Sequence, residues 1–217
     1  MKTAIPVIVI IVSYLFASIP WGLLIGKLRG IDIRKHGSGN IGATNVTRTV
    51  GKGWGRLCFL LDFLKGLLPI LAVRYLIGHE FIDDPYHIVL AATAFACVAG
   101  HMWSIYIGFK GGKGISTTAG LLLALVPYSL IPAAALWVIV FYSFRYVSLA
   151  SICAAIFLPL AALVLSLLNI QPRPASVLVL LFFLGALAVF RHSDNISRLM
   201  NGTESRFDKK NKSGVTR

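Results

Sequence analysis

Charged side chains are scarce in this sequence. They make up 13% of its 217 residues, whereas 57% of the residues are hydrophobic and the mean hydropathy is +0.79. A water-soluble domain of this length does not have enough interior to bury that much apolar surface. The composition therefore predicts an all-α, polytopic integral membrane helical bundle, because helices satisfy their own backbone hydrogen bonds in hydrocarbon.

Cysteine is also scarce, and its three copies are scattered. Cys58, Cys97 and Cys153 all fall in apolar runs, with no CxxC spacing and no neighbouring histidine. Such cysteines are typical of small core residues rather than of disulfides or metal sites. The sequence therefore predicts no bound metal and no cofactor.

Acidic residues are few: 8 Asp and Glu stand against 21 Lys and Arg, for a formal net charge of +13. A charge of this size can indicate nucleic-acid binding. Here, however, the basic residues lie in loops between apolar runs, which membrane topology explains. We therefore expect no nucleic-acid partner. Membrane lipid is the expected partner, and we expect the last residues, Lys209 to Arg217, to lie near anionic headgroups.

Long apolar runs fill most of the chain, at about residues 4–25, 54–77, 86–107, 115–145, 147–168 and 175–190. These runs are too long for barrel strands, and a helix of about 20 residues crosses the hydrocarbon core. The first run is too long for the apolar region of a signal peptide and has no A-x-A cleavage site, so we expect it to remain as one helix. The whole chain, 1–217, is predicted to form a single membrane domain.

The basic residues indicate the topology. Most of them lie between Lys27 and Arg56, at Lys110 and Lys113, and from Arg191 to the C terminus. The opposite set of helix ends carries three acidic residues, at positions 80, 83 and 84. Because cytoplasmic loops are rich in Lys and Arg, this pattern puts the N terminus outside and the C terminus in the cytosol.

The run 115–145 decides the number of crossings. If it crossed once, the basic C-terminal segment would emerge on the wrong side, so we expect it to cross and return, turning near Pro127 and Pro132. This argument predicts about seven transmembrane helices in total. Each arm of this hairpin then has only about 12 to 14 residues, or roughly 20 Å of helix, so short or irregular helices are expected. Residues 205–217 are predicted to form a flexible cytosolic tail.

A first polar segment, GSGNIGATNVTR at 37–48, is dense in glycines and hydrogen-bond donors. Glycines such as Gly39 and Gly42 let successive backbone amides turn inward around an anion. Further donors are Ser38, Asn40, Thr44, Asn45 and Arg48. The segment lacks the GK[ST] of the phosphate-binding loop of nucleoside triphosphatases and follows no dinucleotide-binding strand. It predicts a phosphate site; an ordinary loop between two membrane spans is the alternative.

A second polar segment, GHMWSIYIGFKGGKG at 100–114, ends the third apolar run. His101 and Ser104 are three residues apart and share a helix face. The turn from Lys110 to Gly114 then brings two flexible cations, Lys110 and Lys113, to the same surface. This pattern indicates a second anion site. A positively charged cytoplasmic loop with turn glycines is the alternative.

A third polar segment, RHSDNISRLMNGTE at 191–204, follows the last apolar run. On a helix, Arg191, Asn195 and Arg198 fall at i, i+4 and i+7 and form a polar stripe. His192 lies next to this stripe and is expected to titrate near neutral pH. A solvated helix end is the alternative interpretation.

Two pairs of polar residues sit deeper in the apolar runs. Asp62 and Lys65 are three residues apart, where an unpaired charge would be costly, so we expect them to pair and to support the first segment. Ser148 and Ser151 are also three apart. They either reach the same cavity or bond back to helix carbonyl groups, and the sequence leaves both open.

The three segments, in this order and on one side of the membrane, resemble the acyl-phosphate-dependent glycerol-3-phosphate acyltransferases of bacteria, the small integral-membrane family called PlsY. Asp62 and Lys65-Gly66 add to the resemblance. It implies transfer of a fatty acyl group from acyl phosphate to the sn-1 hydroxyl of glycerol 3-phosphate, giving lysophosphatidic acid and phosphate, the first step of phospholipid synthesis. It also implies a multi-pass protein of the bacterial cytoplasmic (inner) membrane with a cytosolic active site, and a functional link to the enzyme that makes acyl phosphate.

Acyl phosphate is an activated anhydride, so such an enzyme mainly has to hold two phosphates and stabilise an oxyanion, without a protein nucleophile. We assign the catalytic contacts to Ser38, Arg48, Lys113, His192 and Asn195. The expected substrate-binding residues are Gly39, Asn40, Gly42, Thr44, Asn45, His101, Ser104, Lys110, Gly111, Gly112, Gly114, Ser148, Ser151 and Arg198. The acyl chain is expected between helices, with its end in lipid.

The general base has two candidates, His192 and the phosphate of glycerol 3-phosphate, and we favour the substrate phosphate. Neither His101 nor His192 is followed by Asp at the H-x4-D spacing, which argues against the acyltransferases that use acyl-CoA or acyl carrier protein. An anion transporter is the main alternative from another class. It predicts a midplane site and repeated halves, and the sequence shows neither.

Overall fold

The computed structural model describes residues 4–85 and 87–207, which form ten α-helices and two 3₁₀ turns without any strand. The elements are α1 (Ala4–Ala17), α2 (Trp21–Leu28), η1 (Ile33–Lys35), α3 (Ala43–Thr49), α4 (Lys52–Gly78), α5 (Ile88–Met102), η2 (Ile105–Ile107), α6 (Ile115–Leu125), α7 (Pro127–Phe144), α8 (Val147–Leu167), α9 (Ala175–Phe190) and α10 (Ser193–Met200). The predicted all-α class is confirmed for this part of the chain.

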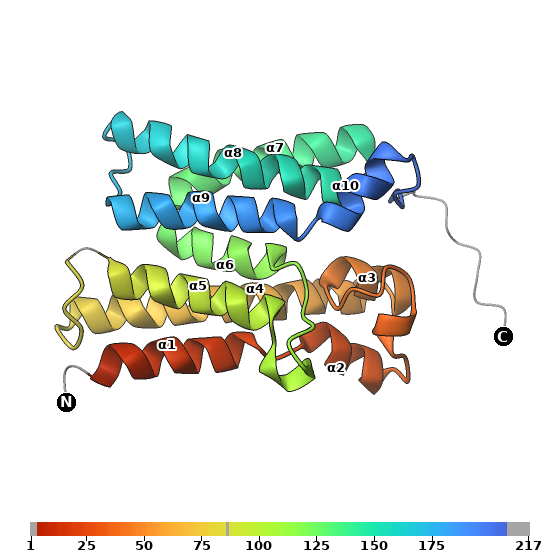
Figure 1. Ribbon diagram of the computed structural model, residues 1–217, viewed down its shortest axis with the longest axis horizontal. Coiled ribbons are helices and arrows are strands. Elements are labelled where there is room, and N and C mark those ends of the chain that lie inside the picture. The colour runs from red at the N-terminus through yellow and green to blue at the C-terminus, as the bar shows by residue number, and fades with distance from the viewer. Residues whose placement is uncertain (1–3, 86, 208–217) are drawn as a thin grey trace.

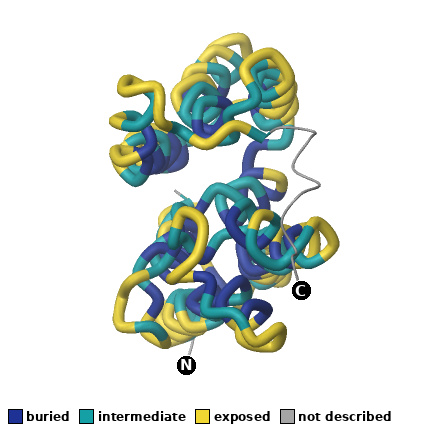
Figure 2. The backbone as a smooth tube through the Cα atoms, turned by 90° about the vertical axis from the view of Figure 1, so that its right-hand side faces the viewer, coloured by how far each residue is buried: buried dark blue, intermediate teal, exposed yellow. Residues whose placement is uncertain are grey.

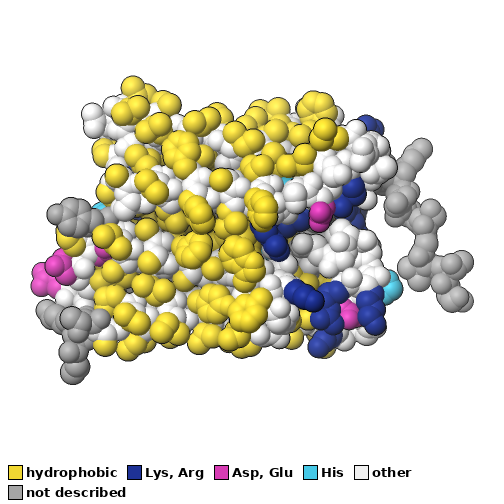
Figure 3. All heavy atoms as spheres, in the orientation of Figure 1, with side chains coloured by type: hydrophobic (Ala, Val, Ile, Leu, Met, Phe, Trp, Pro, Cys, Tyr) yellow, Lys and Arg dark blue, Asp and Glu magenta, His cyan; other side chains and the backbone are white. Residues whose placement is uncertain are grey.

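Several helices are long and apolar enough to cross a membrane. Among the described residues these are Ala4–Leu28, Ile88–Ile107, Pro127–Phe144 and Val147–Leu167, and a fifth if α9 and α10, bent by 52°, count as one. The 27-residue α4 is long enough but carries several charges, and α6 has only 11 residues. Figure 3 shows a broad apolar surface, with Lys and Arg gathered at one end of the bundle, here called the basic end.

The helices pack as two groups. The first group holds α1 to α5, in which α1 packs on α5 and α3 on α4; the second holds α7 to α10, in which α8 packs on α7 and α9 (Figure 1). Between the groups lies α6, which packs mainly on α4. Figure 2, seen from the end of the bundle, separates the same two groups. A site between them can therefore draw side chains from both.

The run 4–25, which we expected to form one helix, is broken at residues 18–20. Pro20 has no amide hydrogen and cannot continue the helical hydrogen-bond pattern. Side chains from elsewhere in the first group satisfy the carbonyl oxygens at the break: Ser104 Oγ, just after α5, donates to Ser18 O at 2.5 Å, and Lys65 Nζ of α4 donates to Ile19 O at 2.9 Å. The prediction of a continuous helix is therefore wrong, and the break places α2 against η1 and α3.

The run 115–145 is interrupted at Val126. Because it has no amide hydrogen, Pro127 suits the first turn of a helix, and it begins α7. Figure 1 shows α6 and α7 running in opposite directions along the bundle. The two arms have 11 and 18 residues rather than similar lengths, because the chain turns before Pro127 and α7 continues through Pro132.

The predicted pair of buried charges in α4 is confirmed. Lys65 Nζ lies 2.9 Å from Asp62 Oδ1, and the two side chains are 1% and 2% exposed. On the adjacent α5, His101 Nδ1 lies 3.7 Å from the same carboxylate oxygen. The pair therefore connects α4 both to the break after α1 and to the end of α5.

Two glycines set the distance between α4 and α6. A Cβ atom on Gly66 would lie 2.0 Å from Thr117 O, and one on Gly120 would lie 2.0 Å from Phe63 O. Small residues of this kind let helix backbones approach closely inside a membrane. The crossing holds α6 against the first group and so fixes one wall of the space between the groups.

We predict that Gly66→Ala lowers the thermal stability of the detergent-purified protein. The added methyl group would force α4 and α6 apart, which costs about 1 to 3 kcal/mol for an overpacked core position. Gly78→Ala, at the end of the same helix but with open space around its Cβ, is the matched control and should melt like the wild type. Equal melting temperatures for the two variants would contradict this account of the crossing.

Candidate active site

A cavity of about 850 Å³ lies between the two groups. Its polar part is lined by all five residues that the sequence assigned to catalysis, namely Ser38, Arg48, Lys113, His192 and Asn195. These residues come from three segments that are far apart in the sequence. The structure therefore brings the three polar segments to one site at the basic end.

The rest of the cavity wall is apolar. It includes Leu122 of α6, Leu130 and Trp137 of α7, Leu158 of α8 and Leu181 of α9. Eleven residues separate Leu158 from Val147 at the start of α8, where the wall reaches the basic end, which corresponds to about 16 Å of helix. One cavity with a cationic end and a long apolar body suits an amphiphilic ligand.

Asn45 holds the first polar segment in shape. Its Nδ2 donates to Ile33 O at 2.9 Å and to His36 O at 3.1 Å, and its Oδ1 accepts from Ser38 N at 2.9 Å. The side chain is 1% exposed. These bonds fix the backbone from which Ser38 reaches the cavity. Asn45 also lines the cavity, and the substrate contact that we expected for it stays a prediction.

Glycine is required at one turn of this segment. A Cβ atom on Gly37 would lie 2.3 Å from Asn45 Oδ1, and the residue has a φ of +60°. Asn40 Oδ1 closes the next turn by accepting from Gly42 N at 2.9 Å. The segment is thus a folded loop with few free conformations rather than a mobile connection between spans.

The glycine-rich loop of the second segment packs on the end of α5. The amide of Gly111 donates to Met102 O at 3.0 Å, and that of Gly112 donates to His101 O at 3.1 Å. Carbonyl groups in the last turn of a helix have no partner within the helix, and this loop supplies one. A Cβ atom on Gly111 would lie 2.0 Å from His101 O, so a larger residue does not fit.

A carboxylate that the sequence analysis did not assign lies at the centre of the polar end. Glu204 Oε1 accepts from Ser148 Oγ and from Asn195 Nδ2, both at 2.7 Å. Its Oε2 accepts from Arg198 Nε at 2.7 Å, and its side chain is 6% exposed. Asn195 in turn accepts from Lys113 Nζ. The sequence signal that could have identified Glu204 was its position as an acidic residue within a strongly basic segment.

The residues after Glu204 also belong to the site. Arg48 Nη2 donates to Ser205 O at 3.1 Å, and its guanidinium carbon lies 5.6 Å from the ring centroid of Phe207. The amide of Phe207 donates to Arg145 O at 2.9 Å. We expected residues 205–217 to form a flexible tail; the Ser205 carbonyl group and Phe207 instead make these contacts, although Ser205 itself is exposed, and residues 208–217 lie outside the described part of the chain.

His192 is buried beside the cavity. Its Nδ1 lies 2.7 Å from Ala188 O, and burial lowers its pKa to about 4. The prediction that it titrates near neutral pH is therefore wrong. A neutral imidazole that donates from Nδ1 to the carbonyl group keeps an unprotonated Nε2, which accepts hydrogen bonds.

Lys113 remains a cation at neutral pH. Burial and the nearby Arg198 lower its pKa to about 8, while the Glu204 carboxylate opposes this effect. Its ammonium group is therefore charged at pH 7 and loses the charge as the pH rises through 8.

The other predicted binding residues divide into two sets. Those that line the cavity are Asn40, Gly42, Thr44, Asn45, His101, Gly114, Ser148, Ser151 and Arg198, together with Asp62. In the described chain the lining does not include Gly39, Ser104, Lys110, Gly111 or Gly112. The hydroxyl of Ser104 is used at the break after α1, and Lys110 is exposed. The substrate contact that we expected for Ser104 therefore stays a prediction.

Ser151 shows both arrangements that the sequence left open. Its Oγ donates to Val147 O at 2.8 Å, one turn earlier in α8, and accepts from Trp137 Nε1 at 3.1 Å. The residue also lines the cavity. It therefore joins α8 to α7 in the wall of the site.

Comparison with known families identifies strong similarity over nearly the whole chain. A family model described as glycerol-3-phosphate acyltransferase matches residues 7–202. The glycerol-3-phosphate acyltransferase of Aquifex aeolicus (strain VF5) is 44% identical over 199 residues, covering 91% of this chain and 97% of that protein. The enzyme of the same name from Trichlorobacter lovleyi is 43% identical over 195 residues, covering 90% and 94%.

Solved structures show the same similarity. A crystal structure of PlsY (YgiH), an integral membrane glycerol 3-phosphate acyltransferase, in its glycerol 3-phosphate form has a TM-score of 0.82 at 43% identity and covers 94% of this chain and 96% of that chain. The lysophosphatidic acid form has a TM-score of 0.79 at 43% identity, with coverage of 94% and 95%. The similarity therefore extends to the three polar segments as well as to the apolar helices.

We predict that Glu204→Gln destabilises the site. Three donors surround the carboxylate, and an amide keeps only one acceptor oxygen for them, so we expect a loss of about 2 kcal/mol in the free energy of unfolding. Thermal unfolding in detergent measures this loss. Asp194→Asn, which neutralises an exposed carboxylate on α10, is the control. A Glu204→Gln protein as stable as that control would show that the three bonds contribute little.

Proposed function

The chain belongs to the glycerol-3-phosphate acyltransferase family, and from this premise we propose that it moves a fatty acyl group from acyl phosphate to the sn-1 hydroxyl of glycerol 3-phosphate. The products are lysophosphatidic acid and inorganic phosphate. The observation that carries this proposal is the single cavity with a cationic end and an apolar body, which suits two phosphorylated substrates of which one carries an acyl chain.

The cationic end accounts for phosphate binding. Arg48, Lys113 and Arg198 line the same part of the cavity, and their charges offset those of two phosphate groups. In the proposed reaction the glycerol hydroxyl attacks the carbonyl carbon of acyl phosphate, the new ester bond forms, and the bond between that carbon and the phosphate oxygen breaks. Phosphate leaves, and cationic or amide donors stabilise the oxyanion formed on the way.

The proton of the glycerol hydroxyl needs an acceptor. A general base works best when its pKa lies near the working pH, and the pKa of His192 is lowered to about 4. A phosphate monoester has its second pKa at about 6 and is the better base. We therefore propose that the phosphate of glycerol 3-phosphate takes the proton, while His192 Nε2 accepts a hydrogen bond that orients the hydroxyl.

The apolar body of the cavity is the proposed site of the acyl chain. Its wall is formed by α6, α7, α8 and α9. Phe59 of α4 and Val138 of α7 both line the cavity and are about half exposed, at 47% each. A membrane-dissolved acyl phosphate can therefore lie with its chain between the helices and its tail toward lipid, as the amphiphilic shape of the substrate requires.

We further propose the orientation of the chain in the membrane. Seven crossings by α1 with α2, and by α4, α5, α6, α7, α8 and α9, would put the N terminus outside and the basic end in the cytosol of a bacterium, at its inner membrane. The concentration of Lys and Arg at that end supports this orientation. Cytosolic glycerol 3-phosphate would then reach the site directly, and a functional link to the enzyme that supplies acyl phosphate follows from the same proposal.

Transport of a phosphate ester is the rival function. A transporter places its site near the midplane, between repeated halves. Here the polar residues of the cavity lie at the basic end, and the sequence shows no repeat. Neither observation favours transport.

We predict that the purified protein forms lysophosphatidic acid from labelled glycerol 3-phosphate with palmitoyl phosphate as the donor, but not with palmitoyl-CoA or palmitoyl carrier protein. We expect this preference for acyl phosphate because the cationic side chains of the cavity can bind its small phosphate leaving group. Product from a thioester would overturn the proposed donor. Without product from any donor, counterflow of labelled glycerol 3-phosphate in proteoliposomes would test transport.

We predict that kcat/KM for glycerol 3-phosphate falls as the pH rises through about 8, because Lys113 loses its charge there. Lys113→Ala should lower kcat/KM about 100-fold, as expected for one lost charged contact at the reacting groups. Lys113→Arg should retain activity at pH 9, since arginine stays charged.

Lys52→Ala, an exposed cation at the start of α4, is the control for general charge effects. Near-normal turnover by Lys113→Ala, Arg48→Ala and His192→Ala would show that the assigned site is wrong.

A further inference from the structure

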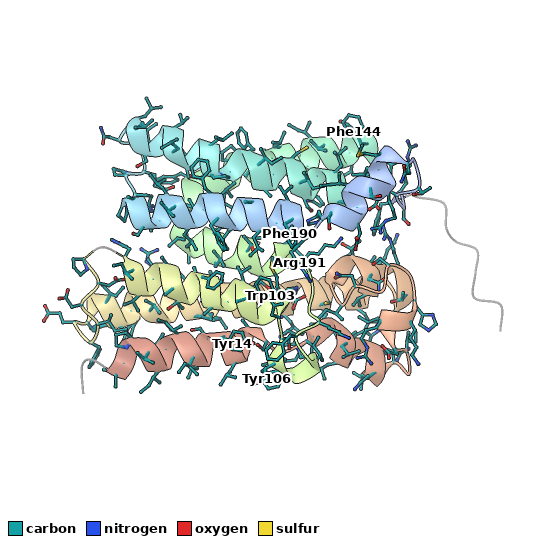
Figure 4. The ribbon with its side chains drawn as sticks, viewed as in Figure 1. Tyr14, Trp103, Tyr106, Phe144, Phe190 and Arg191 are labelled. Atoms are coloured by element: carbon teal, nitrogen blue, oxygen red, sulfur yellow. The ribbon has the colours of Figure 1, made fainter. Side chains whose placement is uncertain are left out.

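Arg191 makes a contact that none of the proposed substrate interactions uses. It follows α9, and its Nη2 donates to Gly112 O at 2.9 Å and to Gly111 O at 3.3 Å. Figure 4 shows Arg191 at the junction of α9 and α10, in the space between the two helix groups. The residue therefore ties the second group to the backbone of the glycine-rich loop, immediately before Lys113.

The loop is held from both sides at these two peptide units. The amides of Gly111 and Gly112 donate to carbonyl oxygens at the end of α5, as described above, and their own carbonyl oxygens accept from Arg191. Neither glycine has a side chain that could hold the loop. Without the guanidinium, the backbone of Gly111 and Gly112 would be held by the first group only, and the loop would reach the second group through the Lys113 side chain alone.

Two contacts with the second group hold Lys113, one at the backbone before it and one at the end of its side chain. Its Nζ donates to Asn195 Oδ1, and Asn195 lies four residues after Arg191. The lysine side chain has four rotatable bonds and cannot by itself fix where its ammonium group lies. With the backbone held by Arg191 and the tip held by Asn195, Lys113 is attached to the second group at both ends.

The guanidinium is partly enclosed by the protein, and Arg191 as a whole has intermediate exposure. Its Nε is enclosed and makes no hydrogen bond among the described residues. Lysine is a poor replacement, because its nitrogen is one bond closer to the main chain than Nη2 and is not planar. The position therefore has a specific need for arginine.

We propose that Arg191 is a positioning residue for catalysis: by holding the carbonyl groups of Gly111 and Gly112, it places the Lys113 ammonium where a substrate phosphate binds. This inference rests on the proposed function. It requires that the effect of Arg191 on turnover pass through Lys113 and not through general stability.

The first experiment measures kcat and KM for both substrates in wild type, Arg191→Gln, Lys113→Ala and the double variant. Arg191→Gln should raise KM about tenfold, and for the same substrate whose KM rises in Lys113→Ala. An effect of this size is expected when hydrogen bonds from a charged group are lost. In the Lys113→Ala background, Arg191→Gln should raise this KM by less than about a further twofold, because the residue through which Arg191 acts is gone. Additive effects would overturn the proposal.

A pH profile gives a second measurement that does not need residual activity in Lys113→Ala. The charged groups that act on Lys113 are Arg191, Arg198, Glu204 and Asp194. The neutral His192 also lines the site. Removing the Arg191 charge should move the alkaline limb of kcat/KM to higher pH. Arg191→Lys keeps the charge, so its limb should stay near pH 8 while its KM still rises.

Controls separate this inference from the proposed function. Arg29→Gln removes another arginine of the basic end, one whose guanidinium carbon lies 5.5 Å from the Trp54 ring, and should leave both KM values unchanged. If wild type transfers no acyl group, the proposed function fails. If wild type is active but Arg191→Gln changes neither KM nor the pH limb, or only lowers the melting temperature, the positioning role fails.

Discussion

The ion pair between Asp62 and Lys65 is the interaction on which the two basic loops of the first helix group depend. Buried charges are tolerated inside a membrane bundle only when they are paired and hydrogen-bonded. Lys65 meets both conditions at once, because it binds Asp62 at 2.9 Å and the carbonyl oxygen of Ile19 at 2.9 Å. The pair thereby stabilises the break that turns α2 toward the first polar segment. Through His101 it also touches the end of α5, where the glycine-rich loop begins.

The site itself is assembled across the interface of two helix groups. Among the described residues, the contacts that join the groups there are those of Arg48 with Ser205 and the Phe207 ring, of Lys113 with Asn195, and of Arg191 with the carbonyl groups of the glycine-rich loop. The apolar wall of the cavity comes mostly from the second group and α6, whereas Ser38, Arg48 and Lys113 come from the loops beside the first group. In the proposed function, a substrate with a phosphate head and an apolar tail would contact both groups, so its binding would depend on how these contacts hold the loops.

The sequence predicted the helices and the three polar segments because both depend on local composition: long apolar runs, and loops dense in glycine and donors. It did not predict the roles that depend on burial. Asn45 and Asn195 are the same residue type in similar polar segments, yet only the fold shows that Asn45 uses its amide within its own loop. The lowered pKa of His192 comes from burial, which three-dimensional packing decides. Pro20 marked a possible break, but its partners, Lys65 and Ser104, are distant in the sequence.

Glu204 shows why an anion site contains a buried carboxylate. Arg48, Lys113, Arg191 and Arg198 bring four cations into a small space, and their mutual repulsion in a poorly solvated site would push them apart. The carboxylate offsets part of that charge and binds Arg198, Asn195 and Ser148 at 2.7 Å each. These donors are thus already in place before a substrate arrives, and Lys113 reaches the same network through Asn195. In the proposed reaction a phosphate that enters would meet preorganised donors, which is the condition under which electrostatic stabilisation of a transition state is largest.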